Sequence, residues 1–248
     1  MKRTLALAAL AVILLGVAWL GGCGSSSQAA ARAQQILDKS ASAIATLKSV
    51  KESGSNGMKS EDSSVPDVTV TFTSEMDLSD PANTRAHTVI QQGASVVDIY
   101  ASGGYVYTKT ASGEWQRTKA EGTSALAPRD LKEIAAGAKN VRLLSSAGGK
   151  YEVAFQVGEK ALADSDLLDG ADTDTALGKQ TAEALKELKM DAVYTVAKDT
   201  MYVERARLNM RMPSVVESGE TTGTMKVDFT GFNEPVSIVL PESTQNAK

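Results

Sequence analysis

Alternation of apolar and polar residues is the clearest pattern in this chain. In residues 67–78, five of the six even-numbered positions are apolar, Ser74 being the exception, and polar or charged side chains take all the positions between them. Residues 151–157, 206–212 and 225–229 follow the same rule. A period of two predicts antiparallel strands that have one dry face and one solvated face.

Further strands are expected between clusters of Gly, Pro, Asn and Asp, which favour turns. These additional segments are residues 49–59, 84–91, 95–101, 105–110, 140–144, 189–197 and 236–240. The strands therefore come in three groups, of about five, two and about four, and a helix precedes each group.

Three segments have apolar residues at helical spacing. In residues 29–50, the apolar positions include Ile36 and Ile44, and charged residues fall largely on the other side. Residues 128–138 begin with a proline, which suits the first turn of a helix, and residues 175–188 form the third segment. Each of these helices must bury its apolar stripe against another element.

The first residues have the pattern of a secretory signal. Lys2 and Arg3 precede an apolar run over residues 5–20, and small residues follow it. The run is shorter and more abruptly ended than a membrane-spanning helix, which needs roughly 20 apolar residues. We interpret residues 1–22 as a signal peptide.

The segment Leu20-Gly21-Gly22-Cys23 resembles the lipobox of bacterial lipoproteins. In that family the Cys sulfur receives a diacylglycerol with fatty acyl chains such as palmitate, and the signal is cut just before the Cys. The resemblance implies that Cys23 is lipidated and that the protein is anchored on the extracytoplasmic face of a bacterial cell membrane. Cys23 is also the only Cys, so no disulfide forms within the chain.

The rest of the chain is divided by composition. Residues 24–28 are Gly, Ser and Gln, so we expect residues 23–28 to form the lipidated end and a flexible tether. Residues 29–248 have the length of a single domain.

The net charge of −4 argues against nucleic acid as a partner.

A family resemblance extends over most of residues 29–241. It is carried by Thr46-Leu47-Lys48-Ser49-Val50, by Asn140-Val141-Arg142-Leu143-Leu144 before Tyr151-Glu152-Val153-Ala154-Phe155, and by the C-terminal strand-turn-strand from Val227 to Pro241. With the lipobox and the order of elements, these segments resemble the LolA-like superfamily, and in particular LppX/LprG-type lipoproteins of actinobacteria. The resemblance implies an α+β fold, a strongly curved antiparallel sheet forming a half-open barrel with helices on its concave side, where the family takes up acyl chains.

If the apolar strand faces line such a half-barrel, they form a site for a lipid or another hydrophobic small molecule, bound without covalent chemistry. The residues expected to line it are Val68, Val70, Phe72, Leu208, Met210, Met212, Val227 and Phe229. Flexible, polarizable Met side chains suit variable apolar ligands, although they also fill ordinary cores. The alternative is an envelope sensory lipoprotein whose own helices fill the concave face and which binds a protein partner.

Residues suited to catalysis or metal binding are scarce. His87 is the only His, no Gly-x-Ser-x-Gly motif occurs, and one His with one Cys cannot complete a zinc site. The acidic run over residues 159–174 lacks the spacing of a calcium-binding EF-hand, so we interpret it as a solvated loop. Trp115 suits either a ligand entrance or the closed end of a barrel. We expect no cofactor and no enzyme activity.

Overall fold

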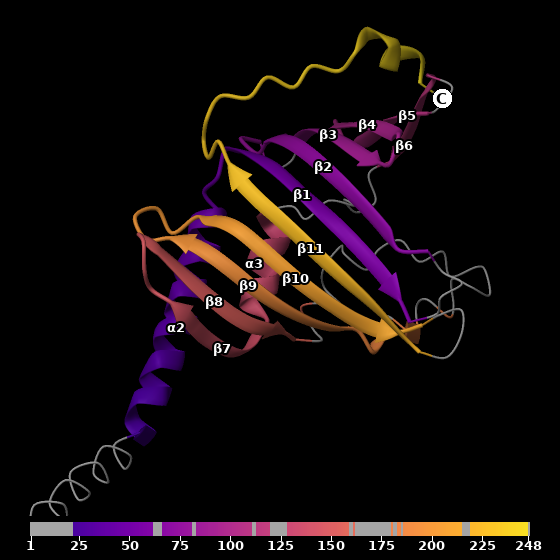
Figure 1. The fold of residues 1–248 in the computed structure, drawn as a ribbon. Coiled ribbons are helices and arrows are strands. Elements are labelled where there is room, and N and C mark those ends of the chain that lie inside the picture. Colours follow the sequence, from indigo (N-terminus) through magenta and orange to yellow (C-terminus); the bar gives the residue numbers. More distant parts are fainter. Residues whose placement is uncertain are drawn as a thin grey trace, which may run out of the picture.

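The computed structural model describes residues 22–61, 66–80, 83–110, 113–119, 128–158, 161, 180, 183–184, 186–214 and 219–247. Within these residues, eleven strands form one sheet (Figure 1). The strands are β1 (Ser49–Ser60), β2 (Val68–Asp77), β3 (Arg85–Gln92), β4 (Ser95–Ser102), β5 (Tyr105–Lys109), β6 (Trp115–Lys119), β7 (Ala138–Ser145), β8 (Lys150–Val157), β9 (Lys189–Ala197), β10 (Val203–Pro213) and β11 (Glu220–Thr230). The helices are α2 (Gly22–Ile44), α3 (Pro128–Ala136) and the short 3-10 helix η2 (Glu242–Asn246).

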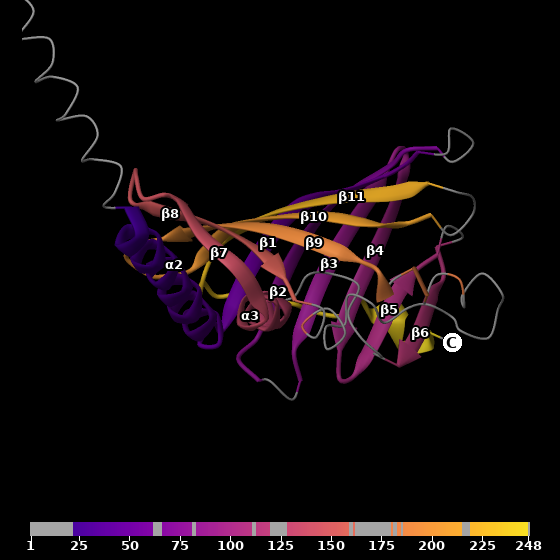
Figure 2. The same cartoon turned by 90° about the horizontal axis from the view of Figure 1, so that it is seen from below.

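The sheet consists of two antiparallel meanders. Its strand order is β6-β5-β4-β3-β2-β1-β11-β10-β9-β8-β7, so only β1 and β11 pair without being consecutive in the chain. Their antiparallel pairing runs from Lys51 opposite Thr230 to Ser60 opposite Thr221 and joins the two meanders. The sheet curves and stays open between β6 and β7, and α2 and α3 lie on its concave side (Figure 2). The α+β, half-open barrel predicted from the sequence is confirmed.

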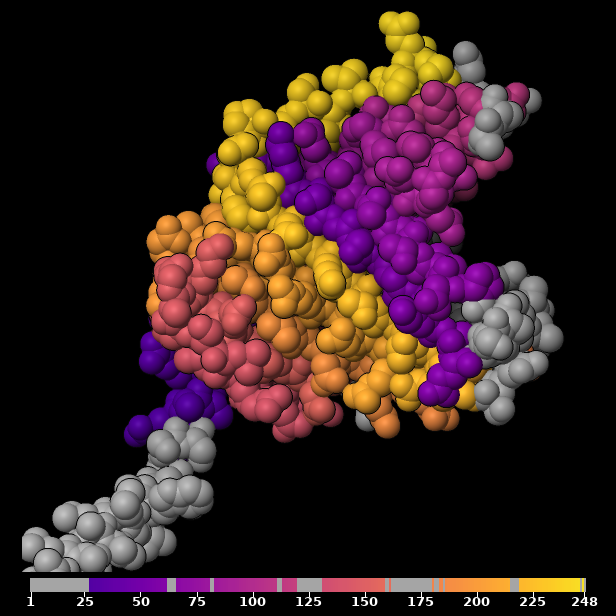
Figure 3. All heavy atoms as spheres, viewed as in Figure 1, coloured from indigo at the N-terminus to yellow at the C-terminus, as the bar shows by residue number. Residues whose placement is uncertain are grey.

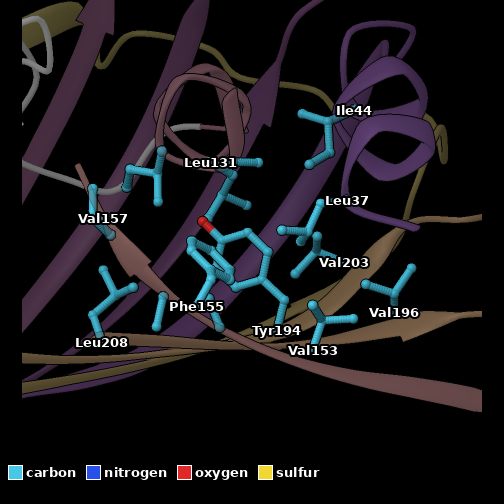
Figure 4. Close-up of a cluster of buried hydrophobic side chains, with 14 of the residues drawn as sticks. Leu37, Ile44, Leu131, Val153, Phe155, Val157, Tyr194, Val196, Val203 and Leu208 are labelled. Carbon is cyan, nitrogen blue, oxygen red and sulfur yellow. The ribbon is translucent and has the colours of Figure 1, made fainter. Parts of the chain in front are cut away.

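The hydrophobic core lies between the two helices and the second meander. α2 contributes Leu37 and Ile44, and it packs against α3, β7 and β8. On the sheet, Phe155 and Tyr194 meet edge to face with their ring centroids 4.9 Å apart, and both are buried (Figure 4). A fully buried large apolar side chain stabilises a fold by roughly 1.5–3 kcal/mol, so this cluster is the main source of stability.

The convex side of the second meander is solvated, as the alternation predicts. In Figure 3, salmon, orange and yellow atoms, the colours of β7 to β11, make up most of this surface. In β10, Ala206 and Leu208 point into the core, whereas Arg205 and Arg211 point outward. Arg211 forms an ion pair across the sheet with Asp191, with 3.3 Å between Nη2 and Oδ2.

The first helix differs from its prediction at both ends. α2 begins at Gly22, so residues 23–28 are helical and do not form the expected flexible tether. Gly and Ser cost at most about 1 kcal/mol each in a helix relative to Ala, a penalty that a continuing helix tolerates. At the other end, Thr46 and Leu47 donate backbone hydrogen bonds to carbonyls three residues back, so the chain turns into β1 where the prediction extended the helix.

The strand predictions were wrong in two places. Residues 236–240 form no strand, because the segment lies outside the sheet and is bounded by Pro235 and Pro241, which lack a backbone donor. This segment crosses beyond β3 and β4 to η2, which contacts β6 (Figure 1). β6 itself was missed, since four of its five residues are polar.

Some predictions concern residues outside the described part of the chain. The signal peptide is outside it apart from Gly22, and most of the acidic run over residues 159–174 is also outside. Of the helix expected over residues 175–188, the described positions 180, 183, 184 and 186 are helical, and the described positions 187 and 188 are not.

Candidate hydrophobic ligand site

The register of the sheet determines which side chains share its concave face. On β1, Val50 is fully buried in the core, so the even-numbered positions that follow it also face the concave side. Met58 pairs with Val68 on β2, and Gly54 pairs with Phe72. The apolar positions of β2 therefore face the concave side, as the alternation predicts.

The predicted lining residues divide into two groups. Leu208, Val227 and Phe229 are 1%, 0% and 3% exposed and belong to the core cluster with α2 and α3. The protein's own side chains therefore fill this part of the concave face, and these three residues are core residues in the structure.

The other predicted residues remain partly accessible. Val68 is 37% exposed, and Val70 and Phe72 are half-buried. Met210 and Met212 are also half-buried and pack at the margin of the core cluster. These residues lie where the two meanders join, beyond the helix-covered part.

Residues that sequence reasoning missed extend this accessible surface onto the first meander. Phe72 lies directly opposite Ile90 on β3, which lies opposite Val97 on β4. Ile99 and Val106 share this face through the same registers. We call Val68, Val70, Phe72, Ile90, Val97, Ile99 and Val106 the open apolar face; all are half-buried except the exposed Val68.

These missed residues had a weak sequence signal. In β3 and β4, apolar residues occur on both faces, for example Val96 beside Val97, so alternation alone does not identify the inner positions. The cross-strand register that starts at Phe72 does identify the inner positions, but this register is known only from the folded sheet.

Two glycines allow long side chains to lie flat on the concave face. A Cβ placed on Gly54 would come within 2.7 Å of the Phe72 ring and 2.3 Å of the Lys226 carbonyl oxygen. A Cβ on Gly223 would come within 3.0 Å of the Met210 methyl carbon. The Phe72 ring and the Met210 thioether therefore occupy space that a side chain would otherwise fill.

Three buried polar residues, Glu52, Ser74 and Thr88, lie on the concave side of the first meander. Ser74 and Thr88 pair through their hydroxyl oxygens at 2.9 Å, and Glu52 lies beside Ser74 on β1. All three side chains are buried. Charged pairs lie on the convex side instead, as with Lys51 and Glu75, whose Nζ and Oε1 are 3.1 Å apart.

His87 lies on the convex side of β3 and faces away from the open apolar face. Its Nε2 is 2.7 Å from Asp98 Oδ1, and its ring stacks on Tyr100 with centroids 4.2 Å apart. Tyr100 in turn meets Trp115 edge to face, and burial raises the pKa of the Tyr100 phenol. Trp115 is itself buried on this outer side, so it does not line an entrance to the concave face.

Neither a metal centre nor a spanning helix is found in the described residues. No group of three or more His, Cys, Asp or Glu side chains there is arranged to hold a metal ion. No described helix combines the length and apolarity needed to cross a membrane. Cys23, the predicted lipidation site, lies in the first turn of α2.

Comparison with solved structures identifies the fold. LprF from Mycobacterium bovis is similar over 85% of this chain and 97% of its own, with a TM-score of 0.51 and 13% sequence identity. A LolA superfamily protein from Nitrosomonas europaea aligns over 86% of this chain and 96% of its own, with a TM-score of 0.31 and 11% identity. The likeness to LprF, a protein of the LppX/LprG type, confirms the LolA-like fold.

Sequence comparison identifies the family. No curated protein sequence matches the chain. A family model matches residues 32–248, a span that begins in α2, includes every strand of the sheet and continues to the last residue. The chain therefore belongs to the family of unknown function DUF6612.

Proposed function

We propose that this protein is a membrane-anchored lipoprotein of the bacterial envelope that binds a lipid or another hydrophobic ligand on its concave face, for transfer or sensing. Binding is non-covalent and needs no cofactor. Cys23 supplies the anchor on the extracytoplasmic side, and the open apolar face supplies the binding surface.

The observation that carries this proposal is the open apolar face itself. Phe72, Ile90 and Val97 form a continuous apolar row across three strands. Phe72 packs at the margin of the core cluster, and Ile90 and Val97 are not part of that cluster. A contiguous accessible apolar surface favours a ligand or partner that removes it from water. Each methylene of an alkyl chain buried there contributes about 0.8 kcal/mol, so a long chain binds without ionic or covalent contacts.

The test uses protein that lacks residues 1–23. All described core side chains lie between Ala33 and Ile238, so this truncation leaves the hydrophobic core complete. We expect the protein to retain lipid that organic extraction releases and native mass spectrometry detects. After delipidation, it should bind a hydrocarbon fluorophore such as diphenylhexatriene.

A charged substitution on the open apolar face should weaken this binding. Val70→Glu places a charge on the apolar surface, and we expect the fluorophore affinity to fall roughly tenfold or more, because an alkyl ligand cannot solvate a carboxylate. Thr71→Glu is the matched control, since Thr71 is the next residue of β2 and is exposed on the convex side. Circular dichroism should show that both variants keep the fold.

One result would reject the proposal: delipidated wild-type protein that binds neither extracted lipid nor the fluorophore. The alternative, a sensory lipoprotein with a protein partner, has its support in the second meander, where Leu208 and Val227 are already buried under the protein's own helices. That alternative predicts specific crosslinking to one envelope protein and equal behaviour of Val70→Glu and Thr71→Glu in fluorophore binding.

A further inference from the structure

Asn56 is a polar residue in an apolar row of the concave face. It lies on β1, opposite Val70 on β2 and opposite Met225 on β11. Leu208 continues the row beyond Met225. A β-branched apolar residue would suit both the strand and these neighbours better than an amide.

The Asn56 side chain has an unmet hydrogen-bonding group. Its Oδ1 is buried and accepts no hydrogen bond from the part of the chain that the structure describes. The hydroxyls of Ser74 and Thr88, on the same face, satisfy each other at 2.9 Å. A buried acceptor without a donor is destabilising, so its presence needs a reason such as a bound group.

Asn56 is also within reach of a ligand on the open apolar face. The residue as a whole is half-buried, and its paired neighbour Val70 belongs to that face. Two positions further along β1, Met58 is 41% exposed. At the position before it on this face, Gly54 has no side chain and the Phe72 ring lies over it. A chain lying on Val70 and Phe72 therefore passes beside the Asn56 amide.

We propose that Asn56 accepts a hydrogen bond from the ligand, and that the ligand is an amphiphile with a hydroxyl or amide N–H next to its alkyl chain. This inference rests on the proposed function and adds the chemistry of the bound molecule. The alkyl part lies along the open apolar face, and the donor pairs with Asn56 Oδ1. Apolar sites commonly fix the orientation of a ligand with a few such polar groups.

The test compares two probes that differ in one donor. Dodecanol and dodecyl methyl ether have the same alkyl chain, but only the alcohol donates a hydrogen bond. Each probe displaces diphenylhexatriene from delipidated protein lacking residues 1–23. We expect wild-type protein to bind dodecanol roughly two- to tenfold more tightly than the ether, because one ordinary hydrogen bond changes a dissociation constant by about this factor.

Substitution of Asn56 should remove that preference. In Asn56→Val, the two probes should bind equally, and diphenylhexatriene should bind at least as tightly as to wild type. Ser55→Val is the matched control, because Ser55 is the preceding residue of β1 and faces the other side of the sheet. It should keep the wild-type preference for dodecanol.

The outcomes separate the two proposals. If diphenylhexatriene binds wild-type protein but dodecanol and its ether compete equally, the role of Asn56 is rejected and hydrophobic binding stands. Persistence of the dodecanol preference in Asn56→Val also rejects that role. If diphenylhexatriene does not bind wild-type protein, both proposals fail. The wild-type comparison is decisive even if the variant does not fold.

Discussion

At the scale of single residues, Asp77 shows how local donors stabilise a charge at a strand end. The Ser79 hydroxyl and backbone N–H donate to Asp77 Oδ1 at 2.6 and 3.1 Å, and Arg85 binds the other oxygen. The hydrogen bonds from Ser79, followed by the Arg85 guanidinium, hold the pKa of the Asp77 carboxyl below its ordinary value of 3.8.

This lowered pKa predicts a pH-dependent contribution to stability. A carboxyl that ionises more readily in the folded chain stabilises the fold above its ordinary pKa, and the contribution disappears as the pH falls through the folded pKa. Asp77→Asn should therefore be less stable than wild type at about pH 7, and the difference should shrink towards about pH 3. Urea unfolding at both pH values measures it.

The control for Asp77 is Asp67→Asn. Asp67 forms an exposed ion pair with Lys59, 3.4 Å from Oδ2 to Nζ, and exposed pairs of this kind contribute little. Its removal should leave stability nearly unchanged at both pH values. Equal stability of Asp77→Asn and wild type at neutral pH would contradict the assignment.

At the scale of elements, Asn233 joins the end of β11 to the start of β1. Its Oδ1 accepts a hydrogen bond from the Lys48 backbone N–H at 2.7 Å, and its Nδ2 donates to the Tyr202 hydroxyl at 2.9 Å. Its own backbone N–H donates to the Ser49 carbonyl at 3.0 Å. The turn after β11 is thereby fixed to the junction of α2 and β1.

Removing this side chain should loosen the junction. Asn233→Ala loses both side-chain hydrogen bonds and puts at φ 59° a residue that adopts the left-handed region less readily than Asn, so we expect it to lower the free energy of unfolding by about 1–3 kcal/mol. Asn233→Gly keeps the left-handed backbone without strain and isolates the side-chain part of the loss. Unfolding curves in urea that coincide for all three proteins would contradict this role of the turn.

At the scale of the whole molecule, α2 connects the proposed anchor to the sheet. The described side chains from Ser27 to Arg32 are exposed, and Ala33 is the first buried residue. This part of α2 projects beyond the sheet (Figure 1). Residues 23–32 rise by about 1.5 Å each, so this exposed part of α2 is roughly 15 Å long.

The anchor itself is testable in living cells. We expect a clickable palmitate analogue to label wild-type protein, and Cys23→Ser to lose the label, because Cys23 is the only thiol in the chain. Ser25→Ala is the matched control and should remain labelled. Label that persists in Cys23→Ser would place the acyl group elsewhere, and wild-type protein without label would reject lipidation.

Local sequence patterns alone were enough to predict most strands and the inner face of several of them. The alternation in residues 206–212 identified the inner face of β10, because neighbouring side chains of a strand point to opposite faces in any sheet. The lipobox interpretation of Cys23 also depends on a short contiguous run, and it stays a prediction. The strand predicted over residues 236–240 was wrong, because a strand needs a hydrogen-bonded partner strand and the local pattern does not show whether one is present.

The tertiary structure decided which inner positions are filled and which are accessible. Leu208 and Val70 follow the same alternation, yet Leu208 is in the core and Val70 is on the open apolar face. Their difference depends on where α2 and α3 pack across the curved sheet, which involves contacts between residues far apart in the chain. Cross-strand pairing likewise decided the neighbours of Ile90 and Val97, which place them on the open apolar face. It also placed Asn56, whose Oδ1 is unpaired, beside Val70. The sequence by itself predicted strands with one apolar face, because side chains alternate along any strand; the tertiary structure decided how much of that face stays accessible.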